Sequence, residues 1–114
     1  MLREDFVEAV RIAERGAQSD PVLALNGGEL FYSGRPGVPR DLERSARCYL
    51  AGLLQIDVVS ELSSSSSQRS QMAKGLLMGV AEVVQRQPAV GATPDAIECM
   101  RKVEAKLHLS LIHI

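Results

Sequence analysis

Nucleophilic or metal-binding chemistry in this chain would have to use its two cysteines and two histidines, the scarcest reactive side chains among its 114 residues. A nucleophilic cysteine needs a general base beside it, and the only histidine before the last six residues is His108. Cys48 and Cys99 lack CxxC spacing and have apolar neighbours, which is typical of free thiols packed as small hydrophobes. A disulfide, or a reactive thiol paired with His108, is the alternative.

Carboxylates could support proton transfer if two of them shared a cleft. The candidate groups are Glu4-Asp5-Glu8 and Asp41-Glu43, and both occur on charged helical faces with arginines nearby. That pattern is typical of solvated surface. Because zinc needs three or four converging ligands, and two isolated cysteines with one histidine do not supply them, we expect no catalytic residue, no metal ligand and no cofactor, and therefore no enzyme in this chain.

Charge and hydropathy exclude other classes of partner. The 13 basic and 14 acidic residues are interleaved and give a net charge of −1, whereas nucleic-acid binding relies on clustered basic residues, so we expect no nucleic-acid partner. Neither Gly27-Gly28 nor the glycines at 34–37 follow a buried strand or precede a P-loop lysine. The longest apolar run, Leu76 to Val84, is about half the length of a membrane span, and no secretory signal opens the chain.

Because the two cysteines are expected to be free thiols, we expect a reducing compartment such as the cytoplasm.

The spacing of apolar residues predicts about five helices. The first should run from about Arg3 to Arg15, with Gly16 as its C-terminal cap. Asp20-Pro21, Asp41 and Thr93-Pro94 are helix-start signals, because Asp or Thr accepts free backbone N–H groups and proline is tolerated in the first turn. For the second segment, Val22 to Tyr32, a β-hairpin turning at Asn26-Gly27 is an alternative.

The later helices have candidate buried faces and one close approach. The predicted buried residues of the third helix are Leu42, Ala46, Tyr49, Leu50, Leu53 and Leu54, and the pattern continues weakly through 58–62. Those of the fourth helix are Met72, Leu76, Val80, Val83 and Val84. Those of the fifth are Ile97, Met100, Val103 and Leu107. The fourth helix should span roughly Gln68 to Arg86. Its Gly75 and Gly79 should let a neighbouring helix come close.

Two segments are predicted to lie outside the packed helices. Ser63–Ser67 is a polar low-complexity run, which we interpret as a flexible linker, with phosphorylation as the alternative. The tail at 109–114, Leu-Ser-Leu-Ile-His-Ile, matches one translated frame of a common sequencing adapter, and we interpret it as an artefact. We therefore expect 1–108 to be a single helical-repeat domain, truncated near His108.

One stretch, from about 20 to 57, carries a specific set of motifs. It contains Gly28-Glu29-Leu30-Phe31-Tyr32-Ser33-Gly34, then Gly37-Val38-Pro39, then Asp41 with Ala46 and Tyr49 at helical spacing. This stretch resembles a Sel1-like repeat, a relative of the tetratricopeptide repeat. It departs from the family pattern in three ways: Arg35-Pro36 adds one residue to the turn, Ser45 replaces the usual alanine, and Cys48 replaces a large aromatic residue.

The resemblance implies an all-α fold of stacked antiparallel helical hairpins, in which Gly28, Tyr32, Gly34, Gly37, Asp41, Ala46 and Tyr49 are the structural positions. Physically, Gly28 and Ser45 should keep the helix crossing tight, and Gly34 and Gly37 should permit a turn that other residues would strain. Tyr32 and Tyr49 should sit near opposite ends of the hairpin and wedge it open.

The function implied by the resemblance is that of a scaffold or adaptor, which would bind a peptide or a helix of a partner protein in its groove. The binding face would be lined by the first helix of the repeat, with Asn26 and Glu29 as polar contacts. Two alternatives remain open at this point. One is a helical fragment of a larger enzyme with its catalytic residues outside this chain, and the other is an import or sorting receptor of the tetratricopeptide type.

Overall fold

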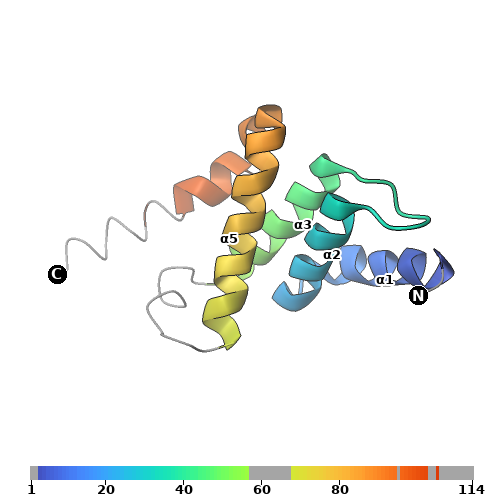
Figure 1. Ribbon diagram of the computed structural model, residues 1–114. Coiled ribbons are helices and arrows are strands. Elements are labelled where there is room, and N and C mark those ends of the chain that lie inside the picture. Colours follow the sequence, from blue (N-terminus) through green and yellow to red (C-terminus); the bar gives the residue numbers. More distant parts are fainter. Residues whose placement is uncertain (1–2, 57–67, 95, 103–104, 106–114) are drawn as a thin grey trace.

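A computed structural model describes residues 3–56, 68–94, 96–102 and 105, and these residues form helices joined by turns, with no strand among them (Figure 1). The elements are α1 (Arg3–Gly16), α2 (Pro21–Ser33), α3 (Leu42–Gln55), α5 (Gln68–Arg86) and the 3₁₀ helix η1 (Pro88–Ala92), followed by a last helix that includes 94 and 96–102. The predicted all-α fold is confirmed. The predicted continuation at 58–62, the serine linker at 63–67 and the tail at 109–114 lie outside the described residues.

Residues Pro21–Ser33 form a helix, so the hairpin alternative is wrong. The Asp20 carboxylate accepts a hydrogen bond from the Val22 backbone N–H at 2.9 Å, and Pro21 occupies the first turn, where its missing N–H costs nothing. The helix ends where the Gly34 N–H donates to the Leu30 carbonyl. Asn26-Gly27 therefore lies inside a helix, because capping at both ends outweighs the local turn preference of the pair.

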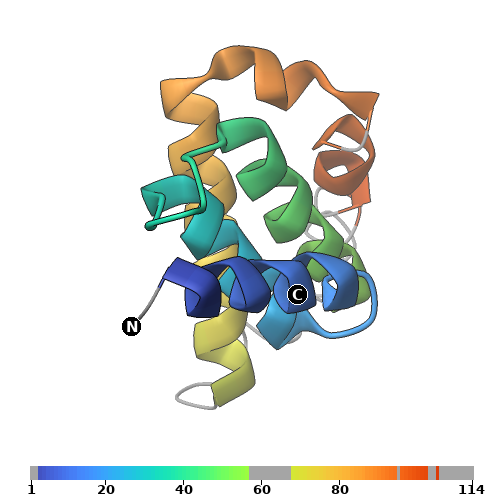
Figure 2. The same cartoon turned by 90° about the vertical axis from the view of Figure 1, so that its right-hand side faces the viewer.

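The helices α2 and α3 form an antiparallel pair that lies between α1 and α5, and α1 crosses the direction of α5 at a large angle (Figures 1 and 2). Across α2 and α3, the Cα hydrogen of Gly28 faces the Tyr49 ring and that of Gly52 faces Ala24, so early residues of one helix meet late residues of the other. Gly52 also faces Leu76 of α5. Small residues at these crossings let the backbones approach closely.

The bend between α2 and α3 is a tight turn centred on Pro36-Gly37. Arg35 and Val38 exchange backbone hydrogen bonds of 2.9 and 2.7 Å around it. Gly34 and Gly37 have φ values of 73° and 84°, a region that residues with a Cβ rarely adopt. Asp41 then caps α3 by accepting from the Arg44 N–H at 3.1 Å, as predicted. Gly16, in contrast, was predicted to cap α1 but is the last residue of the helix itself, and its φ is not positive.

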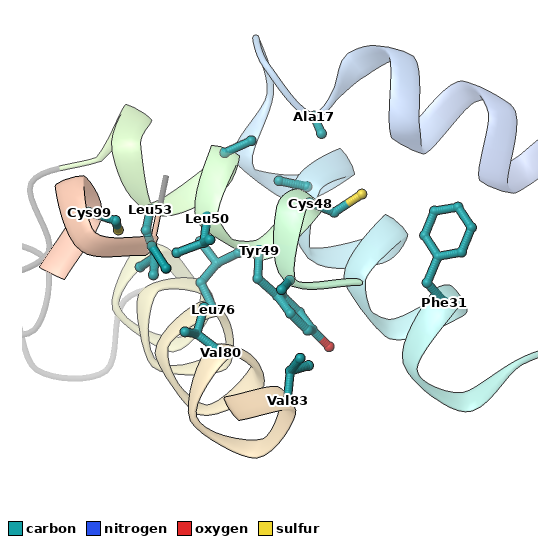
Figure 3. Packing of buried hydrophobic residues seen from close by; sticks show 14 of the residues in the cluster. Ala17, Phe31, Cys48, Tyr49, Leu50, Leu53, Leu76, Val80, Val83 and Cys99 are labelled. Carbon is teal, nitrogen blue, oxygen red and sulfur yellow. The ribbon is translucent and has the colours of Figure 1, made fainter. Parts of the chain in front are cut away.

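Tyr49 lies in the middle of α3 and is buried between two glycines, Gly28 of α2 and Gly79 of α5. Figure 3 shows its side chain directed from α3 toward α5, close to Val83. A Cβ on Gly28 would lie 2.4 Å from the ring, and a Cβ on Gly79 would lie 2.5 Å from it. The predicted wedge is therefore wrong for Tyr49, because its ring occupies space that the two glycines leave open.

The predicted buried faces are correct in part. Leu76, Val80 and Val83 are buried, but Leu54 is 42% exposed, and Ile97 and Met100 are each 47% exposed. The last helix instead buries Ala96 and Cys99, and Cys99 lies near Leu50 and Leu53 in Figure 3. The small side chains of Ala96 and Cys99 let the last helix come closer to α3 than Ile97 and Met100 would.

The packing of Tyr49 predicts opposite effects for two identical substitutions in α5. Gly79→Ala should destabilise the fold by about 1–3 kcal/mol, since the new Cβ overlaps the buried ring. Gly75→Ala is the matched control: its Cβ would lie 3.3 Å from the movable end of Leu25, and alanine favours helix by up to about 1 kcal/mol. Urea unfolding followed by circular dichroism measures both, and a Gly79→Ala protein as stable as Gly75→Ala would contradict the packing argument.

Candidate functional site

The two residues predicted to contact a partner, Asn26 and Glu29, are both exposed on α2. With Val22, which is 53% exposed, they are spaced four and three residues apart and share one helical face. We call this face the ridge of α2. The ridge lies outside the α2–α3 interface, since α2 buries Ala24, Gly27, Gly28 and Phe31.

A groove runs between α1 and α2, on one side of the ridge. It has a volume of about 380 Å³, and both Asn26 and Glu29 line it. Its other lining residues are Ala9, Ile12, Ala13, Leu23, Leu30 and Arg35. Ile12 is 52% exposed, and most of the lining residues are apolar, with Asn26, Glu29 and Arg35 as the polar ones.

A second groove runs between α2 and the N-terminal half of α5, on the other side of the ridge. Its volume is about 600 Å³, and it is lined by Pro21, Val22, Leu25, Glu29, Gln68, Arg69, Gln71, Met72 and Gly75. Glu29 therefore borders both grooves. Within the described part of the chain its carboxylate forms no ion pair.

The motif residues inside the hairpin have structural contacts. Ser45 donates a hydrogen bond of 2.6 Å to the Gly28 carbonyl, which fits the predicted tight crossing, and Ala46 is buried. Cys48 faces Gly27, whose Cβ would lie 2.9 Å from the sulfur. A large aromatic residue at position 48 would collide with α2, so the departure from the repeat pattern at Cys48 matches the local packing.

Tyr32, the other tyrosine predicted to wedge the hairpin, contacts two arginines. It is half-buried near the end of α2, and the guanidinium carbons of Arg40 and Arg86 lie 5.2 and 5.6 Å from its ring centroid. Arg86 Nε also donates to the Tyr32 hydroxyl at 2.5 Å. This cluster was not predicted, since Arg86 is 54 residues from Tyr32 in the chain and no local pattern links them.

Both cysteines are free and buried. Burial, reinforced by the nearby Glu14 carboxylate, raises the pKa of the Cys48 thiol to about 11, and burial also raises the pKa of Cys99. His108 lies outside the described residues. Among the residues that are described, no three His, Cys, Asp or Glu side chains come together as a metal site. No helix within the same ranges has the length and apolar character of a membrane span.

Comparison with known proteins gives no relative: no family model matches the chain, and no curated protein or solved structure matches it either.

The buried thiol and phenol predict a loss of stability in alkaline solution. Burial raises the pKa of Cys48 from 9.0 to about 11 and that of Tyr49 from 10.0 to about 12, so the unfolded chain releases these protons at lower pH than the folded one. The resulting stability is complete below pH 9 and falls as the pH rises toward 11 and beyond. Urea unfolding at several pH values should show this decline.

Cys48→Ala is the variant that isolates the thiol contribution. The alanine variant should lose less stability between pH 9 and 11 than the wild type, whatever its absolute stability at pH 7. The same decline in both proteins would show that Cys48 is not a source of the pH dependence.

Proposed function

We propose that this chain is a protein-binding scaffold of the Sel1-like type, and that the ridge of α2 with its two flanking grooves takes up a peptide or helix of a partner protein. The observation that carries the proposal is the position of Glu29. Its carboxylate borders the groove toward α1 and the groove toward α5, and no cation within the described residues neutralises it by an ion pair.

The shape and chemistry of the grooves favour a helical or extended peptide. Exposed Ile12 offers an apolar contact in the groove toward α1, and exposed Val22 offers one in the groove toward α5. Asn26 and Glu29 offer hydrogen-bond acceptors, and the Asn26 amide also offers a donor. A peptide bound in a groove typically buries apolar anchors and satisfies polar groups at the edge. A basic or hydrogen-bond-donating side chain of the partner would complement Glu29.

The Sel1-like assignment is part of the proposal and has its own support. The motif residues serve the hairpin: Gly34 and Gly37 allow the bend, Asp41 caps α3, and Gly28 gives room to Tyr49. In a stacked repeat such a hairpin packs on its neighbours and leaves the first helix of the pair facing the groove.

The test is a photo-crosslinking experiment in cells with one site on the ridge and one away from it. A photoreactive amino acid replaces Asn26 in one variant and Glu98, on the exposed surface of the last helix, in the other. We expect a discrete crosslinked partner from position 26 and none from position 98. Equal crosslinking at both positions would count against a binding site on the ridge.

The captured partner then allows a charge-reversal comparison. Glu29→Arg should weaken its binding by about tenfold, which corresponds to about 1.4 kcal/mol, while Glu98→Arg should leave it within about twofold. Glu29→Arg should unfold at the same urea concentration as the wild type, since Glu29 is exposed and forms no ion pair within the described residues. Glu98→Arg should lose up to about 1 kcal/mol, because it removes the exposed ion pairs with Arg101 and Lys102. Unchanged affinity for Glu29→Arg, measured by titration calorimetry, would refute the assignment of Glu29.

A further inference from the structure

The cluster around Tyr32 contains two guanidinium groups on one aromatic ring. Arg40, in the bend before α3, lies 5.2 Å from the ring centroid, and Arg86, in the last turn of α5, lies 5.6 Å from it. Both arginines are exposed. The cluster lies outside the two grooves, since none of its three residues lines either of them.

Most of the other described cations with assigned contacts are neutralised by carboxylates. Arg11, Arg44, Arg47, Arg101 and Lys102 each form an ion pair with a glutamate. Arg40 and Arg86 differ, because their guanidinium groups lie on Tyr32 and form no ion pair in the described part of the chain. Arg35, which lies over Phe6, also has no ion pair there but stands alone on its ring. Two positive charges therefore remain at one place without a counterion from these residues.

The contacts with Tyr32 hold the two arginines and leave most of their donors available. The Arg86 Nε–H donates to the tyrosine hydroxyl. The two terminal NH₂ groups of Arg86 have no acceptor among the described residues. None of the five N–H donors of the Arg40 guanidinium has an acceptor among the described residues either. Stacking on an aromatic face restricts a guanidinium without neutralising it, which lowers the entropy lost when an anion binds.

We propose that Arg40 and Arg86, held on Tyr32, bind the side-chain carboxylates of an acidic peptide. Guanidinium groups pair with carboxylates through two parallel hydrogen bonds, and two such groups on one ring suit clustered Asp or Glu side chains. The chain's net charge of −1 disfavours a long polyanion such as a nucleic acid. The site is independent of the ridge of α2 and could bind its peptide even if the ridge binds nothing.

The Glu82 carboxylate opposes this binding. Glu82 lies one helical turn before Arg86 on α5 and forms no ion pair with it among the described residues. It is close enough to raise the pKa of Tyr49, as is Glu29, although burial is the larger cause. Glu82→Gln should therefore strengthen binding of an acidic peptide severalfold, since it removes a like charge.

The experiment measures fluorescence anisotropy of a labelled glutamate-rich peptide in low salt, with the same peptide carrying glutamine as the uncharged probe. Arg40→Gln combined with Arg86→Gln should weaken binding by about tenfold or more. Arg11→Gln combined with Arg47→Gln is the matched control, because it removes the same charge from two exposed arginines that already have partners. The control should bind within about twofold of the wild type.

Two substitutions of Tyr32 test whether the aromatic ring contributes to binding beyond the charge of the two arginines. Tyr32→Leu removes the ring and should weaken binding severalfold although both arginines remain, whereas Tyr32→Phe keeps the ring and should lose less. Circular dichroism and urea unfolding of each variant confirm that the fold is retained. Three results would overturn the proposal: equal loss in the two arginine pairs, no preference for glutamate over glutamine, or tighter binding of a labelled single-stranded oligonucleotide than of the peptide.

Discussion

The close approach of three helices around the Tyr49 ring determines the rest of this structure. Gly28 on one side and Gly79 on the other leave no room for a Cβ, so the ring fills the volume where α2, α3 and α5 meet (Figure 3). A residue with a side chain at either position would push a helix away. With the three helices held at this distance, the ridge of α2 lies between α1 and α5, and the two grooves follow from that spacing.

The bend between α2 and α3 fixes the register in which these helices meet. The Asp41 N–H donates to the Phe31 carbonyl at 2.9 Å, so α3 begins beside the end of α2. Ser45 then reaches the Gly28 carbonyl, and Tyr49 follows one turn later at the same glycine. This register turns Asn26 and Glu29 away from α3, which makes them available as surface contacts.

The arginines around these helices make two kinds of contact. The Arg44 guanidinium forms a two-point ion pair with Glu14, at 3.0 and 3.1 Å, and so ties α1 to α3. Arg40 and Arg86 lie on Tyr32 instead and tie the bend to the end of α5 without having their charge neutralised. Because an ion pair neutralises a cation and an aromatic contact does not, the first arrangement serves the fold and the second leaves charge for a ligand.

Local signals in the sequence determined the helices and the bend. Asp20-Pro21 and Asp41 start α2 and α3 because a carboxylate accepts backbone N–H groups that no earlier turn can reach. Gly34 and Gly37 fix the bend because it needs positive φ. Each of these features depends on residues a few positions apart, so a linear pattern is enough to find it. The expectation that Asn26 and Glu29 lie on the first helix of a repeat came from the resemblance instead, because Val22–Tyr32 also has the local signal of a β-hairpin.

The tertiary structure alone decided which side of a helix is buried and which distant residues meet. Ile97 and Met100 have the spacing of a buried face, yet Ala96 and Cys99 are buried instead, since a small face packs more closely against α3. Three further features involve helices that are far apart in the chain. They are the packing of Tyr49 between two glycines, the position of Glu29 between two grooves, and the contact of Arg86 with Tyr32. Such contacts depend on volume and distance in three dimensions, which the order of residues does not specify.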